Sequence, residues 1–132
     1  MEYVVIVRGR LKGDKKQAQA VHDATLAKIS PQSREMGSTG HQTFLRADDP
    51  KEFLAVDFWN NMEAIGKLYS DPNLAVEFGK LFEGQPEVTI WGNSGWMSYM
   101  DMYFKRISWT AHHQIPCCGL IPPMQAENPA TY

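Results

Sequence analysis

The order of apolar and polar positions divides most of the chain into short segments of two kinds. Four segments are rich in β-branched or aromatic side chains, as is typical of strands: residues 3–7, 41–46, 53–59 and 88–91. Three others place apolar side chains at three- and four-residue steps, as is typical of helices: residues 14–30, 60–69 and 71–82. The predicted order is β-α-β-β-α-β, the split βαβ arrangement of a ferredoxin-like α+β fold.

Capping residues mark the predicted ends of the helices. Asp14 followed by Gln17 resembles a capping box, and Asn60 takes the same place before the second helix. Asp71 followed by a proline restarts that helix, because proline suits a first helical position. Ser30-Pro31 is expected to end the first helix and could start a short second helical piece, since proline suits a first helical position.

The strands differ in polarity, and this difference predicts their places in the sheet. Residues 3–7 and 53–59 are apolar on both faces, which suits a central pair, whereas residues 41–46 are more polar and suit an edge. With all helices on one side, the other face of the sheet would meet water. A second copy of the chain is the simplest cover, so we expect a homodimer.

Composition limits the class of protein. The 132 residues, 43% of them hydrophobic, suffice for one core, which we expect in a domain of residues 1–95. Residues 96–132 form a tail that is first rich in aromatic residues and methionine and then in proline. The net charge of −2 without a basic run argues against a nucleic-acid partner, and no apolar run is long enough to span a membrane. Cys117 and Cys118 are adjacent, which leaves no ordinary disulfide framework and favours a cytoplasmic protein.

Three short motifs carry a family resemblance over roughly residues 3–96. Asp57-Phe58-Trp59 leaves the third strand, Glu63-Ala64 follows in the next helix, and Ser70-Asp71-Pro72 restarts it. With the order of elements, these motifs resemble the antibiotic biosynthesis monooxygenase family of the dimeric α+β barrel superfamily. The resemblance implies a barrel made by two subunits, a pocket between helices and sheet, and no flavin, haem or metal cofactor. It also implies a small-molecule substrate, a phenol or quinol that loses a proton and gives an electron to dioxygen.

Three residues are candidates for catalysis. His22 lies on the inward stripe of the first helix and could act as a base, although a core or boundary histidine is the alternative. Trp59 and Tyr69 could line an aromatic slot and donate hydrogen bonds, although packing alone would also explain a tryptophan at that position.

Four further residues are candidates for substrate binding. His41 and Asp57 would form a base and its orienting carboxylate if the strand register places them side by side, whereas a slip of one residue would separate them. Arg8 could stabilise an anionic oxygen or form an ion pair at the barrel rim. Phe78 is either a wall of the pocket or plain core.

Other activities are weighed against this hypothesis. Glu77 and Phe78 occupy the place where haem-degrading relatives carry a histidine, which argues against haem breakdown. His112-His113 with Cys117-Cys118 match no recognised zinc spacing, so no metal site is predicted. A non-catalytic ligand-binding or assembly protein, and an isomerase or cyclase, remain alternatives on the same scaffold. A filled pocket would favour the non-catalytic protein, and an open cavity with His22 pointing inward would favour an enzyme.

Overall fold

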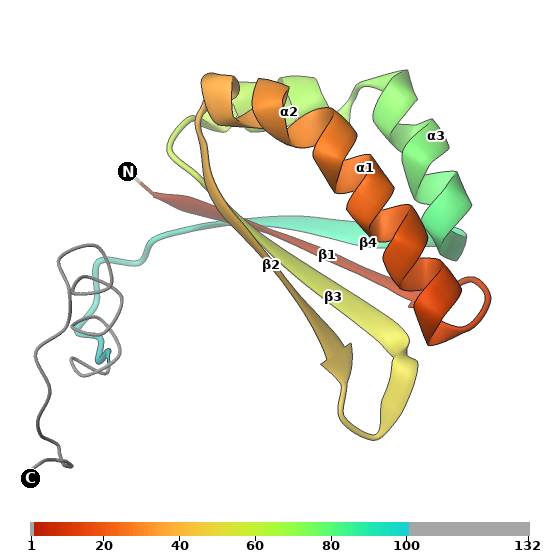
Figure 1. The fold of residues 1–132 in the computed structure, drawn as a ribbon. Coiled ribbons are helices and arrows are strands. Elements are labelled where there is room, and N and C mark those ends of the chain that lie inside the picture. Colours follow the sequence, from red (N-terminus) through yellow and green to blue (C-terminus); the bar gives the residue numbers. More distant parts are fainter. Residues whose placement is uncertain (1, 101–132) are drawn as a thin grey trace, which may run out of the picture. The chain divides into compact units, whose positions relative to one another are not determined.

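The computed structural model describes residues 2–100 of the chain. Met1–Ser94 belong to one compact unit, and Gly95 begins a second. The described residues form four strands and three helices in the following order (Figure 1): β1 (Tyr3–Leu11), α1 (Lys15–Met36), β2 (Ser38–Arg46), β3 (Asp49–Trp59), α2 (Met62–Tyr69), α3 (Pro72–Leu81) and β4 (Phe82–Gly92). No helix in this part of the chain is both long and apolar enough to cross a membrane.

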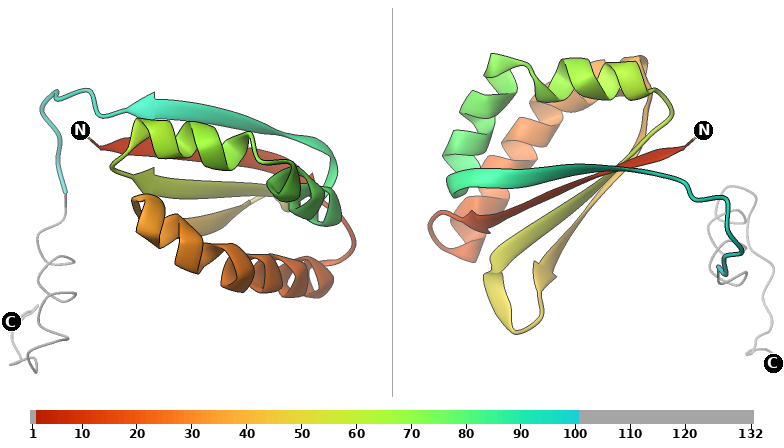
Figure 2. Two further views of the ribbon diagram at one scale, coloured as in Figure 1. Left: turned by 90° about the horizontal axis from the view of Figure 1, so that it is seen from above. Right: turned by 180° about the vertical axis from the view of Figure 1, so that it is seen from behind.

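The four strands form one antiparallel sheet in the order β2-β3-β1-β4. All three helices lie on one face of this sheet, so the unit has two layers (Figures 1 and 2). The predicted α+β ferredoxin-like fold is confirmed. The two most apolar strands, β1 and β3, are central, and the more polar β2 is at an edge, as their patterns predict.

Helix α1 is longer than predicted, because it continues through Pro31 to Met36. A proline inside a helix costs about 3 kcal/mol, since it cannot donate to the carbonyl four residues earlier. Packing of the last turn opposes this cost: Ser33 is buried and its hydroxyl donates to the carbonyl of Ile29 at 3.0 Å, and Met36 packs on the core. Gly37 follows Met36 as the C-cap of the helix, and its positive φ of 122° suits glycine. The prediction that Pro31 ends the helix was wrong.

Two of the three predicted helix caps are present, and the third is shifted by one residue. Asp14 and Gln17 form the predicted capping box. Asp71, which directly precedes the proline, accepts from the backbone N–H of Asn73. Helix α2, however, is capped by Asn61, which accepts from the backbone of Ala64, and not by the preceding asparagine. Strands β2, β3 and β4 also begin earlier than predicted, because backbone pairing extends beyond their apolar runs.

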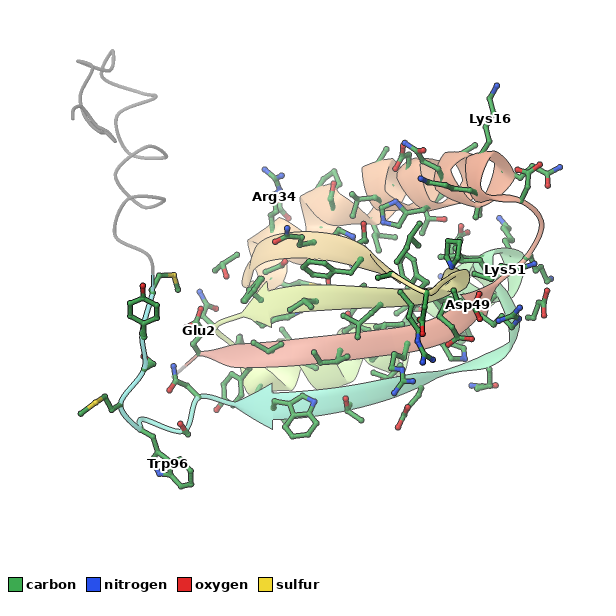
Figure 3. All side chains as sticks on the ribbon, turned by 90° about the horizontal axis from the view of Figure 1, so that it is seen from below. Glu2, Lys16, Arg34, Asp49, Lys51 and Trp96 are labelled. Atoms are coloured by element: carbon green, nitrogen blue, oxygen red, sulfur yellow. The ribbon has the colours of Figure 1, made fainter. Side chains whose placement is uncertain are left out.

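The core lies between the sheet and the helices. Its most deeply buried side chains are Val5, Trp59, Ile65 and Phe82, and α1 contributes Ala18. Because neighbouring residues of a strand point to opposite faces, the register assigns a second set of apolar side chains to the uncovered face. These are Val4, Ile6, Phe44, Leu54, Val56, Phe58 and Trp91. Figure 3 views this open face from below, with α1 behind the sheet.

Candidate active site

A cavity of about 530 Å³ lies between the helical layer and the sheet. Its apolar walls come from both layers, including Val7 and Phe53 of the strands and Leu26 and Phe78 of the helices. Polar side chains gather on the side formed by α1, β2 and β3, where His22, His41 and Asp57 line it. The cavity is therefore an apolar pocket with a local cluster of acid–base groups, as is common in small-molecule sites.

Hydrogen bonds connect these acid–base groups in one chain. The Nδ1 atom of His41 lies 2.5 Å from Oδ1 of Asp57, and the Tyr69 hydroxyl donates to Oδ2 of Asp57 at 3.0 Å. On the other side, Nε2 of His41 lies 3.0 Å from Nε2 of His22, whose Nδ1 is 2.9 Å from Oδ1 of Asp23. The chain thus runs from Tyr69 in the cavity wall to Asp23, whose side chain is 62% exposed.

Strand register and helix periodicity bring these groups together. His41 of β2 is paired with Asp57 of β3, so the two side chains share the face under the helices. His22 lies on the inward stripe of α1 and reaches the edge strand. Tyr69 is the last residue of α2, which ends above Asp57. The sequence left the register open, and the structure has the pairing that joins His41 and Asp57.

Tyr69 keeps its proton at neutral pH. Burial raises the pKa of its phenol well above the ordinary value, and the negative charge and hydrogen bond of Asp57 add to this rise. The Trp59 indole opposes the rise slightly. The neutral hydroxyl therefore donates to Asp57, and its oxygen has lone pairs with which to accept a proton from a ligand.

Trp59 brings a second donor to the cavity wall. Its side chain is 1% exposed and its indole N–H has no hydrogen-bond partner of ordinary geometry among the described residues, although it lies near the Tyr69 hydroxyl. Buried donors are nearly always paired, so this N–H is an unsatisfied polar group in the cavity wall. Phe78 forms part of the opposite wall and meets Phe82 edge to face, with ring centroids 5.8 Å apart.

Comparisons with known proteins identify the fold. No protein-family model and no curated protein sequence matches the chain. SnoaB, a cofactor-independent oxygenase from Streptomyces nogalater, is similar in structure, with a TM-score of 0.59 at 16% identity over 74% of this chain and 98% of its own. A structure described as an antibiotic biosynthesis monooxygenase has a TM-score of 0.51 at 13% identity, over 69% of this chain and 97% of its own. The fold is that of the antibiotic biosynthesis monooxygenases. Rv0793 from Mycobacterium tuberculosis shares it, with a TM-score of 0.54 at 22% identity over 74% of this chain and 100% of its own.

Within this monooxygenase fold, Glu77 is a cavity residue that sequence reasoning did not propose. Its carboxylate accepts from Thr25 at 3.1 Å, from Lys28 at 3.0 Å and from Lys80 at 3.2 Å. Hydrogen bonds from Lys28 and then Lys80 are the main causes that lower the pKa of Glu77 to about 2. Lys80, three residues further along the same helix, was the signal available in the sequence.

Not every predicted residue reaches the cavity. Arg8 follows Val7 in β1, and because strand residues alternate, its side chain lies on the open face and does not line the pocket. The other proposed site residues line the cavity: His22, His41, Asp57, Trp59, Tyr69 and Phe78. His112, His113, Cys117 and Cys118 lie outside the described residues. Among residues 2–100, no cluster of three or more His, Cys, Asp or Glu is placed to hold a metal ion.

Proposed function

We propose that this protein is a cofactor-independent oxygenase that acts on a small hydroxylated aromatic compound or quinol. The observation that carries the proposal is the hydrogen-bonded chain from Tyr69 through Asp57 to His41, set in the wall of a largely apolar cavity. A reaction that begins by removing a proton from an apolar substrate needs this combination. The cavity is open and His22 lines it, and both features favour an enzyme over a non-catalytic protein with a filled pocket.

The size and walls of the cavity suit such a ligand. A volume of about 530 Å³ is within the range of small-molecule pockets. Phe53, Phe78 and Phe82 provide aromatic walls against which a flat ring can pack. A ligand hydroxyl placed on the polar side would meet Tyr69 and Asp57, while the unpaired Trp59 N–H could bind an oxygen of the same ligand.

The chemistry follows from these contacts. The ligand O–H bond breaks, and its proton enters the chain at Tyr69, which passes its own proton to Asp57. The resulting anion is a better electron donor than the neutral ligand, and it gives one electron directly to dioxygen. The Trp59 N–H stabilises the developing negative charge. The electron comes from the ligand, so no protein group changes its oxidation state in this step.

Structural relatives support the same reaction class. SnoaB is named as a cofactor-independent oxygenase, and its chain is covered almost completely by the match. We propose the same activity for this protein, whose cavity is lined by His22 and His41.

We also infer that the active form is a homodimer. The open face of the sheet carries Ile6, Val56 and Phe58 at its centre and the half-exposed side chains of Phe44 and Trp91 towards its edges. A continuous apolar surface of this kind normally marks an interface, and a second copy of the same sheet matches it in size and polarity. The cavity lies on the opposite face, so dimerisation in this way leaves it free to take a ligand.

Oxygen consumption tests the proposed function. Candidate quinols and hydroxylated polycyclic aromatics are supplied to the wild type, to Tyr69→Phe and to the control Tyr3→Phe, whose ring packs on the core but does not line the cavity. We expect uptake by the wild type and the control, and a loss of about 100-fold or more in Tyr69→Phe. Equal rates in all three proteins would remove the proposed site, and the absence of uptake with every compound would contradict the oxygenase.

The same hydrogen-bonded chain supports a second candidate, an isomerase or cyclase that moves protons without consuming oxygen. The observation in its favour is that all the groups in the chain are acids and bases. Following ligand loss and oxygen together distinguishes the two, because only the oxygenase couples them. Ligand loss at an equal rate under nitrogen would favour the isomerase or cyclase.

A further inference from the structure

The rings of His22 and His41 in the cavity wall lie edge to edge, with their Nε2 atoms facing each other. Their Nε2 atoms are 3.0 Å apart, their ring planes are within 19° of parallel, and their ring centroids are 5.2 Å apart. The centroids are thus 2.2 Å (5.2 minus 3.0) farther apart than the nitrogens, which rings stacked face to face would not show. His22 and His41 are therefore arranged for one N–H···N hydrogen bond between them.

The other nitrogen of each ring faces a carboxylate. Nδ1 of His22 is 2.9 Å from Asp23, and Nδ1 of His41 is 2.5 Å from Asp57. Two rings therefore make three contacts, and each contact needs one proton, because an ionised carboxylate only accepts. Two neutral imidazoles carry one N–H each and supply two protons. The complete set of contacts needs a third, which gives the two rings one positive charge in common.

The two carboxylates differ in their access to water. The side chain of Asp23 is 62% exposed, whereas that of Asp57 is 15% exposed. Asp57 is also held by the Tyr69 hydroxyl. When the pair loses its extra proton, the contact at Asp23 is the one that can open without burying an unpaired group, since Asp23 can turn to solvent.

Two other titratable side chains of the cavity wall, Glu77 and Tyr69, already have hydrogen-bond partners, and Arg34 in the last turn of α1 is a cation of the same wall. Glu77 of α3 lines the same cavity, but its carboxylate is occupied by Thr25, Lys28 and Lys80. Tyr69 of α2 reaches the pair only through Asp57.

We propose that His22 and His41 form one proton-holding unit, which takes up a single shared proton and exchanges it with solvent at Asp23. The number of protons that the three contacts need does not depend on a bound substrate. The use of this proton rests on the proposed function: the unit would store the proton lost by the ligand hydroxyl. The neutral pair also has a second arrangement, in which both N–H bonds lie on the Asp23 side of each ring and Nδ1 of His41 is bare. This arrangement matches a protonated Asp57, because the carboxyl group that has taken the proton from Tyr69 then donates to Nδ1 of His41 and can pass the proton to it.

The charge left on the pair has a direct consequence for the ligand. The proton is removed from the ligand oxygen but its positive charge stays in the cavity wall, where it attracts the new anion. Asp23 is in this account a positioning residue. It touches no ligand and acts only by completing the contacts of the charged pair.

The proposal is tested by following the nitrogen-15 NMR signals of the histidine rings as the pH is changed. The experiment uses the full chain, with no ligand and no oxygen turnover. His22→Gln and His41→Gln assign the ring signals. In the wild type we expect both rings to change protonation together in one step that binds one proton, with the two Nε2 signals averaged by the shared proton. Two independent steps of one proton each would overturn the proposal.

Replacement of Asp23 by asparagine adds a second test, whose readout would not change if Asp23 had only a structural role. At a fixed pH, Asp23→Asn should reduce the fraction of the charged pair, because its amide can also donate to a bare Nδ1 and so favours the neutral rings. The matched control is Asp48→Asn, an exposed aspartate that pairs with Arg46 and is not in contact with the pair. Ring signals that are the same in both variants would contradict the role of Asp23. A shared proton in a protein that consumes no oxygen would refute only the proposed function.

Discussion

Removal of the Tyr69 hydroxyl tests the hydrogen-bonded chain through protein stability. Tyr69→Phe keeps the ring that lines the cavity and deletes only the donor to Oδ2 of Asp57. A hydrogen bond to a charged group contributes about 1.5–3 kcal/mol. We therefore expect the free energy of unfolding at pH 7 to fall by about 2 kcal/mol, a large fraction of the stability of a small domain.

The effect should depend on pH in a direction that follows from the raised pKa of Tyr69. Below about pH 10 both the folded and the unfolded wild type keep this phenolic proton, so the full difference from Tyr69→Phe is present. Above about pH 10 the unfolded chain releases the proton while the folded protein holds it. Unfolding of the wild type then becomes easier, and its advantage over Tyr69→Phe should shrink by about 1.4 kcal/mol by pH 11.

Urea unfolding followed by circular dichroism at pH 7, 9 and 11 measures this difference. Tyr3→Phe is the control, because it also removes one phenol but leaves the chain of hydrogen bonds intact. A Tyr69→Phe variant as stable as the wild type at pH 7, or a stability difference that does not change up to pH 11, would refute the reasoning.

Three further predictions concern Glu77, two glycines and the open face of the sheet. Glu77→Gln should lower the free energy of unfolding at pH 7. Because the pKa of Glu77 is lowered to about 2, this loss should fade as the pH falls from about 4.5 towards 2. A difference between the two proteins that stays constant with pH in thermal melts would contradict this prediction. Gly9→Ala should destabilise the fold by about 1–3 kcal/mol, because the added Cβ would lie 2.6 Å from the Phe82 ring. Gly66→Ala, which adds a Cβ in open space on α2, should stabilise the fold by up to about 1 kcal/mol. Thermal melts that show equal effects for both variants would be inconsistent with the packing at Phe82. Val56→Glu should convert the proposed dimer into monomers in sedimentation experiments, and an unchanged mass would exclude this face as the interface.

The fold was predictable from the sequence because the strongest local signals agree with the final packing. The strands with apolar residues on both faces became the central pair, and Asp14 and Asp71 became helix caps. The prediction failed where tertiary packing overrides a local preference. Pro31 lies inside α1 because burial of the following turn outweighs its cost. Strand ends were underestimated, because pairing with a neighbour extends β4 through polar residues.

The site was predictable in its residue types and not in its connections. His22 was placed inward by helix periodicity, and the structure confirms that it lines the cavity. The contact between His22 and His41 could not be predicted, since it depends on how α1 lies across the edge strand. Glu77 was missed because a carboxylate on an inward stripe is unfavourable until its partners Lys28 and Thr25, far away in sequence, are known.

A crystal structure with a bound phenol that does not react with oxygen tests the central claim most directly. The account predicts the ligand ring in the cavity between Phe53 and Phe78, with its hydroxyl about 2.6–3.2 Å from the Tyr69 oxygen or from Oδ2 of Asp57. An empty cavity at saturating ligand, or a ligand whose hydroxyl faces away from both groups, would contradict it.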